Sequence, residues 1–272
     1  MLKSIHSNHY LPKSTFDGFF CWIKKININQ SFIRYLIIFC LIILVSGCAT
    51  KEEKSTAQSL YLNAYNLLKN KDYLESAKEF EKIDDEFPFS KWALKGQVMA
   101  GYAYFKEKEF DKVINITEDF VRLNPVSKYV PYMLYLRGLC YYLQIPAIDR
   151  SQDNTKSVSA IFRELVVKYP NDPHALDAKE KLEFIDEHIA GAILEQARQQ
   201  IKQKNFVGAI NNLQLVINRY RYTKQLVESY FRLAEIYWFL GDKVEFKKIF
   251  SIIQRDHQDS YWFQKLKNIK FS

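Results

Sequence analysis

Apolar residues recur at spacings of three and four along most of the chain from residue 58 onward, and charged residues fill the positions between them. This period is typical of amphipathic α-helices, whereas a half-buried strand alternates apolar and polar residues. Glycine and proline are few, 8 and 7 in 272 residues, which argues against a β-rich chain of many tight turns and against a disordered one. The pattern therefore predicts an all-α fold.

The helical pattern also repeats along the chain. A small residue recurs at Ala64, Gly101, Gly138, Ala197 and Ala234, with 37 residues between neighbours except for 59 between Gly138 and Ala197. In tetratricopeptide (TPR) repeats, a small residue is needed where the two helices of a hairpin approach closely, and aromatic residues fill the gaps between hairpins. The sequence therefore predicts a TPR-like α-solenoid of about five helical hairpins.

The longer step after Gly138 has two predicted causes. One is an insertion near 144–152, and the other is an uninterrupted helical pattern that follows Pro173. Asn171 or Asp172 would cap this helix and Pro173 would stand in its first turn, so we predict one long helix over 174–203. We accordingly assign 58–172 to TPR repeats 1–3, and 173–272 to the long connecting helix and repeats 4–5. The aromatic-rich end from Tyr261 would cap the last repeat.

The N-terminal segment has the pattern of a bacterial export signal. The apolar run Tyr35–Val45 follows a basic flank and is too short for a spanning helix of about 20 residues, but it fits the apolar region of a signal peptide. The next residues, up to Cys48, resemble a lipobox. We therefore expect 1–47 to be a lipoprotein signal peptide, Cys48 to be the lipidation site and 48–57 to be a lipidated tether. Ala49 in place of Asp resembles lipoproteins sorted to the outer membrane, so we expect a lipid-anchored protein on its periplasmic face.

Charge and reactive residues narrow the functional classes. The formal net charge of +8 includes five Lys/Arg and one acidic residue in 1–47, which leaves 34 basic and 30 acidic residues in the remainder. This balance does not indicate a nucleic-acid partner. The remaining histidines His174, His188 and His257 are dispersed, and the sequence has no phosphate-binding glycine motif and no metal-ligand spacing. We therefore predict a protein that is not an enzyme and that needs no cofactor or metal.

The first helices of repeats 1–3 carry aromatic residues at positions expected to face the concave surface. Tyrosine buries a large ring while keeping a hydroxyl group for hydrogen bonds, which suits peptide binding. The sequence therefore predicts a groove for an extended, aromatic-rich polypeptide, and the alternative is that these rings only pack the repeats together. The predicted groove residues are Tyr61, Tyr65, Tyr102, Phe105, Tyr132, Tyr135 and Tyr142, accompanied by Leu68, Val98 and Leu139, with Lys69, Lys95 and Lys106 on or near the same face.

The equivalent positions of repeats 4 and 5 are mixed in character, which suggests a surface for a folded partner. They are Leu194, Arg198, Ile201, Lys202, Phe231, Glu235, Trp238 and Phe239.

Several segments resemble the BamD (ComL) family of outer-membrane β-barrel assembly factors over roughly residues 55–250. They are Tyr73–Pro88, Tyr132–Leu139, the insertion Ile148–Gln152, Val158–Pro170 and Ala175–Ala178. The chain departs from the family pattern at Ser151, at Gln199-Gln200 and at Asn211-Asn212.

The resemblance implies a function without covalent chemistry. Repeats 1–3 would recognise unfolded outer membrane proteins, and repeats 4–5 would hold BamA within the β-barrel assembly (BAM) complex, with Arg198, Asn212 and Trp238 as expected BamA contacts. Other BAM subunits and the membrane, through the lipid anchor, are the further expected partners. The competing hypothesis is a TPR lipoprotein that serves as a scaffold for periplasmic peptidoglycan enzymes.

Overall fold

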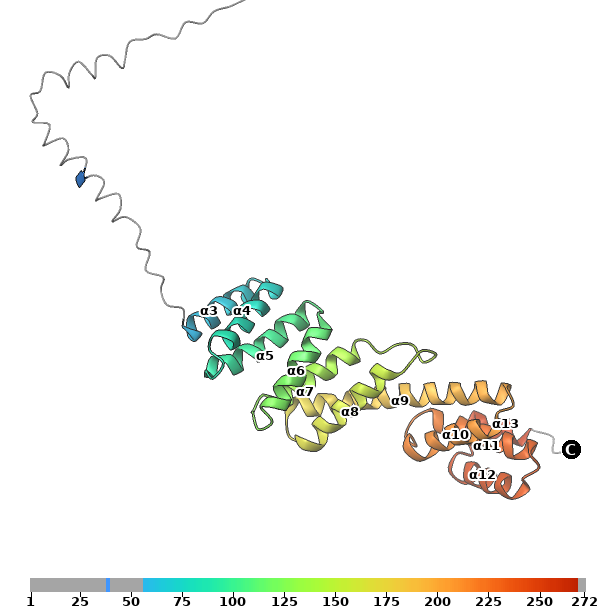
Figure 1. Cartoon of the computed structure of the whole chain (residues 1–272). Coiled ribbons are helices and arrows are strands. Elements are labelled where there is room, and N and C mark those ends of the chain that lie inside the picture. Colours follow the sequence, from blue (N-terminus) through green and yellow to red (C-terminus); the bar gives the residue numbers. More distant parts are fainter. Residues whose placement is uncertain (1–37, 40–55, 269–272) are drawn as a thin grey trace, which may run out of the picture. The chain divides into compact units, whose positions relative to one another are not determined.

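The computed structural model describes residues 38–39 and 56–268 (Figure 1). The predicted signal peptide, the lipidation site Cys48 and most of the tether lie outside the described residues. Within the described ranges, no helix combines the length and the hydropathy needed to cross a membrane.

The described part from residue 56 onward is built from helices joined by short turns, and the prediction of an all-α, TPR-like fold is confirmed. From Ala57 to Asp256, helices that follow one another in the sequence pack side by side, and the first helices of the first three repeats also touch their neighbours. The helices are α3 (Ala57–Lys69), α4 (Tyr73–Glu86), α5 (Lys91–Lys106), α6 (Phe110–Leu123), α7 (Val130–Tyr142), α8 (Asp153–Lys168), α9 (Pro173–Lys202), α10 (Phe206–Arg219), α11 (Gln225–Phe239), α12 (Lys243–Asp256) and α13 (Tyr261–Lys267).

One type of C-terminal cap closes the first helix of four hairpins. Lys71, Lys108, Lys204 and Gly241 each have a positive φ, of 67°, 62°, 59° and 76° respectively. The amide of the following residue donates to the carbonyl five residues back, as in Asp72 to Leu67. This is the Schellman motif, which glycine fills most easily because other residues are strained at positive φ. Lysine occupies three of these four sites. Of these four helix ends, glycine therefore indicates only the one at Gly241 in the sequence.

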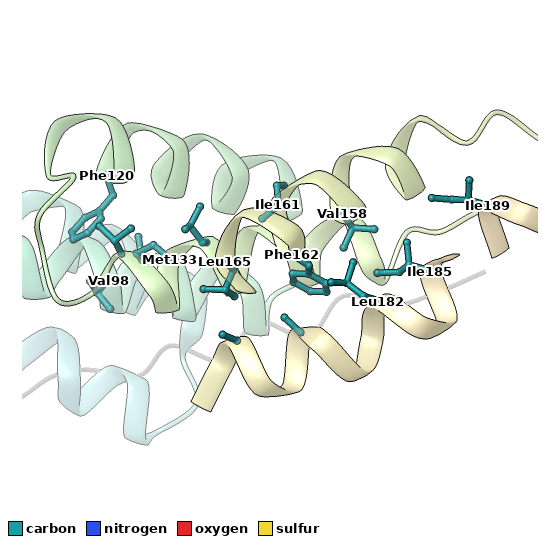
Figure 2. Close-up of a cluster of buried hydrophobic side chains, with 14 residues drawn as sticks. Val98, Phe120, Met133, Val158, Ile161, Phe162, Leu165, Leu182, Ile185 and Ile189 are labelled. Atoms are coloured by element: carbon teal, nitrogen blue, oxygen red, sulfur yellow. The ribbon is translucent and has the colours of Figure 1, made fainter. Parts of the chain in front are cut away.

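The small residues predicted at the helix crossings are buried. Ala64, Ala197 and Ala234 have no exposed surface, and at Gly138 a Cβ atom would lie 2.1 Å from the Phe162 ring. Helices α7 and α8 therefore approach so closely at position 138 that no side chain fits there. Figure 2 shows Phe162 among the apolar side chains of α8 and α9, in a core cluster that continues to Phe120 and Met133.

Helix α9 has the predicted length and cap. The Asp172 side chain accepts a hydrogen bond from the amide of His174, and the helix runs from Pro173 to Lys202. It packs against α7 and α8 as well as against α10 and α11. His188 of α9 also lies 2.8 Å from the carbonyl oxygen of Pro146, so the insertion between α7 and α8 is held against the long helix.

Helix α13 contacts α11 and buries Phe263 and Leu266. Both side chains belong to the core cluster formed by α9 to α13. The C-terminal aromatic segment therefore covers the last repeat, because a terminal repeat has no following hairpin to bury its apolar face.

Candidate functional site

The aromatic face of repeats 1 and 2 begins on α3. The Tyr61 and Tyr65 rings are stacked with centroids 6.4 Å apart, and Tyr61 also contacts Trp92 of α5 at 4.9 Å. Tyr65 is 36% exposed. Two ammonium groups lie over these rings, Lys69 Nζ at 4.9 Å from the Tyr65 centroid and Lys95 Nζ at 5.0 Å from that of Trp92. The pairing of aromatic rings with cations suits a ligand that carries both aromatic and carboxylate groups.

Tyr129, just before α7, joins this face from the third repeat. Burial raises the pKa of the Tyr61 hydroxyl, and the hydroxyls of Tyr65 and Tyr129 raise it further. Lys128 Nζ lies 5.2 Å from the Tyr129 ring centroid.

Neither Trp92 nor Tyr129 was among the residues predicted from the sequence. Trp92 is the second residue of α5 and Tyr129 is the N-cap residue of α7, and each follows a Ser-Lys pair. The repeated Pro-x-Ser-Lys-aromatic pattern is a signal that could have identified them.

Tyr102 and Phe105 are half-buried on α5. Phe105 packs against Phe110 with ring centroids 6.0 Å apart and borders the core cluster between α5, α6 and α7. Tyr102 is close enough to Tyr132 for its hydroxyl to raise the Tyr132 pKa. Tyr102 therefore lies near the tyrosines of α7, whereas Phe105 packs within the second repeat.

The three predicted residues of α7 contact the long helix or its first turn. The Tyr135 hydroxyl donates to Asp177 Oδ2 at 2.5 Å, Tyr132 meets His174 edge-on at 5.3 Å, and Tyr142 meets Phe184 edge-on at 5.9 Å.

Burial dominates the electrostatics of these tyrosines. It raises the pKa of Tyr132 to about 12. It also raises the Tyr135 pKa, where the hydrogen bond to Asp177 acts in the same direction because it stabilises the protonated hydroxyl. These rings are therefore partly occupied by packing within the chain, whereas Tyr65, which stacks only on Tyr61 among the described rings, is 36% exposed.

The predicted partner-contact residues of repeats 4 and 5 also have partners within the chain. Arg198 of α9 binds the buried Glu228 of α11 through two nitrogens, at 3.0 and 2.6 Å, and also Glu195 at 3.0 Å. Asn212 Nδ2 donates to Gln200 Oε1 at 3.1 Å. Trp238 packs on Phe246 with ring centroids 5.2 Å apart.

Two residues expected on the same surface are core residues instead. Leu194 and Phe231 are buried in the cluster that joins α9 to α13. The exposed part of this face is a shallow pocket between α9, α10 and α11, where Phe239 lies against Phe206 at 5.0 Å. The pocket is lined by Ile201, Lys202, Lys204, Phe206, Arg232, Glu235, Ile236 and Phe239.

Ionisable side chains do not gather as a metal site in the part of the chain that the structure describes, where no group of three or more His, Cys, Asp or Glu residues is placed to hold an ion. The features described above are surfaces of aromatic and charged side chains, a composition that suits polypeptide binding through contact area and hydrogen bonds.

A stack of helical hairpins with these surfaces defines an α-helical repeat protein. A comparison with protein-family models assigns the chain to one such family. The family model described as "YfiO: Outer membrane lipoprotein" matches residues 53–249. The chain belongs to this family, and it is therefore a protein associated with the outer membrane.

Curated relatives carry the name outer membrane protein assembly factor BamD. The protein of Rickettsia prowazekii is 29% identical over 81% of this chain and 90% of its own length, and that of Caulobacter vibrioides is 28% identical over 80% and 74%. That of Neisseria meningitidis serogroup A is 29% identical over 76% and 85%. Among solved structures, a putative kinesin light chain with TPR-like repeats from Podospora anserina aligns at 15% identity with a TM-score of 0.39, covering 75% of this chain and 96% of that one.

Proposed function

We propose that this chain is an outer membrane protein assembly factor of the BAM complex, which binds unfolded outer membrane proteins and BamA and promotes membrane insertion of the substrates. The observation that carries the proposal is the family match over residues 53–249, together with relatives that are named as assembly factors and align over most of their length. The function requires binding surfaces and no covalent chemistry, so we propose that the chain is not an enzyme.

The substrate would bind the aromatic face of repeats 1–3. Tyr65 and Trp92 offer rings with lysine ammonium groups beside them. An extended segment with aromatic side chains could stack on these rings, and a terminal carboxylate could pair with Lys69 or Lys95. Tyr61, Tyr102 and Phe105 continue the face toward α7, where Tyr132, Tyr135 and Tyr142 form its border with α9.

BamA would bind repeats 4–5. The network of Arg198 with Glu228 fixes the spacing of α9 and α11, and the exposed Phe239 offers an apolar anchor beside the cations of the pocket. Arg198, Asn212 and Trp238 would act mainly by holding this surface in shape. Lipidation of Cys48 would keep the protein on the periplasmic face of the outer membrane, where both partners are found.

The test is crosslinking of the tagged full-length protein in its own envelope, with a photoreactive amino acid at a single position. At Tyr65 or Trp92 we expect crosslinks to unfolded outer membrane proteins, and at Phe239 crosslinks to BamA. Val207 is the control, because it is 73% exposed but lies outside both surfaces.

Peptidoglycan enzymes at these positions, with BamA absent, would contradict the proposal. That result would favour the scaffold function on the same fold.

A further inference from the structure

The second helix of each hairpin is followed by the same four-residue turn. These turns come after α4, α6, α8, α10 and α12. In each, the amide of the fourth residue donates to the carbonyl of the first: Ser90 to Phe87, Ser127 to Asn124, Asp172 to Tyr169, Thr223 to Tyr220 and Ser260 to His257, at 3.0 Å in every case. Proline at the second position of the first three turns suits this geometry. The third residue stands at the tip of each turn. Because the five turns share this hydrogen bond, the tip residues can be compared directly.

The tip is apolar in the first two repeats only. Phe89 is 102% exposed and Val126 is 97% exposed. The corresponding residues are Asn171, Tyr222 and Asp259, and Tyr222 directs its hydroxyl to Asp186. The turn itself therefore does not require an apolar tip, since asparagine and aspartate serve in the same place. A fully exposed phenylalanine at one tip and an exposed valine at the equivalent tip of the next repeat suit a partner that buries both.

Both tips lie at the edge of the repeats where α3 begins. Successive helices run back and forth (Figure 1), so α3, α5 and α7 begin at the same edge, where α4 and α6 end. The contact of Tyr61 with Trp92 confirms that α3 and α5 start side by side. Thr56, the cap of α3, is therefore at the edge that carries Phe89 and Val126. From Cys48 to Thr56 an extended chain reaches at most about 30 Å.

We propose that this edge, formed by the turns 87–90 and 124–127, rests on the phospholipid surface, with Phe89 and Val126 inserted between the headgroups. The inference rests on the proposed lipidation of Cys48, which would hold the edge within reach of the bilayer. A second contact of this kind strengthens a lipid anchor, since apolar side chains enter the boundary between headgroups and acyl chains.

Charged side chains of both signs stand near this edge. Lys91 and Lys128 each follow a tip by two residues and lie over the ring of the next residue, Trp92 or Tyr129. Asp84 and Asp85 line a cleft between α4, α5 and α6, and Asp84 Oδ2 accepts a hydrogen bond from Gln97 Nε2 of α5 at 2.7 Å. The lysines can meet lipid phosphates, but the nearby carboxylates offset their charge, so we expect insertion of the two apolar tips to be the main contact and the surface charge of the vesicle to be secondary.

The test places an environment-sensitive fluorophore at each tip of the full mature lipoprotein, through Phe89→Cys or Val126→Cys. Cys140 is fully buried, and the sulfur of Cys48 would be bonded to the lipid. The fluorophore should therefore react with the introduced cysteine. Val207→Cys is the matched control: it is also an exposed valine, and it stands at the start of the second helix α10, at the opposite edge. The vesicles contain phosphatidylethanolamine and phosphatidylglycerol, with a nitroxide quencher on the acyl chains.

For the vesicle-bound protein, we expect a shift of emission to shorter wavelength and several-fold stronger quenching at 89 and 126 than at 207. Equal spectra and equal quenching at the three positions would overturn the inference while leaving the anchor and the assembly function intact. A protein that fails to float with vesicles would overturn the anchor and this inference together, and crosslinking to BamA and substrates would still test the function separately.

A second measurement uses substitutions without a label. The variant Phe89→Ser with Val126→Ser should transfer from donor to acceptor vesicles several-fold faster than the wild type, because it loses both inserted side chains. The control variant Val207→Ser with Val244→Ser removes two exposed valines, 73% and 76% exposed, at the starts of the second helices α10 and α12 and should transfer at the wild-type rate. Equal transfer rates for both variants would contradict the inference.

Discussion

At the scale of single residues, tyrosines with similar sequence surroundings have different environments. Tyr65 has an exposed ring with one lysine beside it. The Tyr135 ring is stacked on Phe162 at 6.0 Å, and its hydroxyl is bonded to Asp177. The first side chain is available to a ligand, whereas the second contributes to the packing of α7 on α8 and α9.

Substitution of these two tyrosines separates binding from stability. Tyr65→Ala should lower the free energy of unfolding by at most about 1 kcal/mol, because the side chain is partly exposed and loses mainly its stacking on Tyr61, and it should weaken binding of an aromatic-ended peptide. Tyr135→Ala should lower the free energy of unfolding by about 3 kcal/mol, because it removes a packed ring. Urea denaturation and peptide titration by fluorescence measure the two effects. Equal losses of stability would show that Tyr65 is also a packing residue.

The buried thiol of Cys140 gives a pH-dependent prediction. Burial raises its pKa to about 12, so the thiolate, which is the reactive form, is scarce at neutral pH. In the folded lipoprotein the thiol should stay unreactive toward a disulfide reagent at pH 8 and react at once in denaturant. The stability that the neutral thiol contributes should be lost as the pH rises from about 9, its usual value, toward 12. Rapid labelling of the native protein at pH 8 would show that α7 opens locally.

At the scale of elements, the two small residues Gly101 and Gly138 occupy equivalent positions in consecutive hairpins but differ in what surrounds them. At Gly101, the atom nearest to an added methyl group would be Leu136 Cδ2 at 3.4 Å, which is ordinary contact. At Gly138, an added methyl group would clash with the Phe162 ring. Of these two positions, only Gly138 therefore requires a residue without a side chain.

Alanine at the two glycines should have opposite effects on stability. Gly138→Ala should destabilise the protein by about 1–3 kcal/mol, because the added methyl group overpacks the crossing. Gly101→Ala should be neutral or stabilising by up to about 1 kcal/mol, because alanine is the better helix former. Thermal unfolding followed by circular dichroism compares them. A tolerated Gly138→Ala would mean that Phe162 can move aside.

At the scale of the whole described molecule, one buried carboxylate joins segments that are far apart in the sequence. Asp186 of α9 is 2% exposed. It accepts two hydrogen bonds from Arg163 of α8, at 2.5 and 2.7 Å, and another from Tyr222 in the turn before α11. The third repeat, the long helix and the C-terminal repeats thus meet at a single side chain.

Removal of this carboxylate should weaken the whole unit. We expect Asp186→Ala to lower the free energy of unfolding by about 1–3 kcal/mol, less than for a fully buried ion pair because Arg163 is half-exposed. Glu183→Ala, at an exposed position of the same helix, should have no measurable effect. Chemical denaturation with probes on α8 and on α11 makes the comparison, and an unchanged midpoint for Asp186→Ala would contradict the prediction.

The sequence by itself determined the helices, their pairing into hairpins and the long helix α9. These features depend on local periodicity, on caps such as Asp172 and on small residues at a regular spacing, all of which act over a few residues. The family also follows from sequence, because the match spans most of the chain.

Only the tertiary structure decided which aromatic and charged residues remain available to a partner. A tyrosine suits a core and a binding groove equally well, and the outcome at Tyr135 depends on Asp177, 42 positions along the chain. Arg198 likewise meets Glu228 across 30 positions. Periodicity assigns a residue to a face of its own helix, but the approach of α9 and α11 to that face depends on long-range packing.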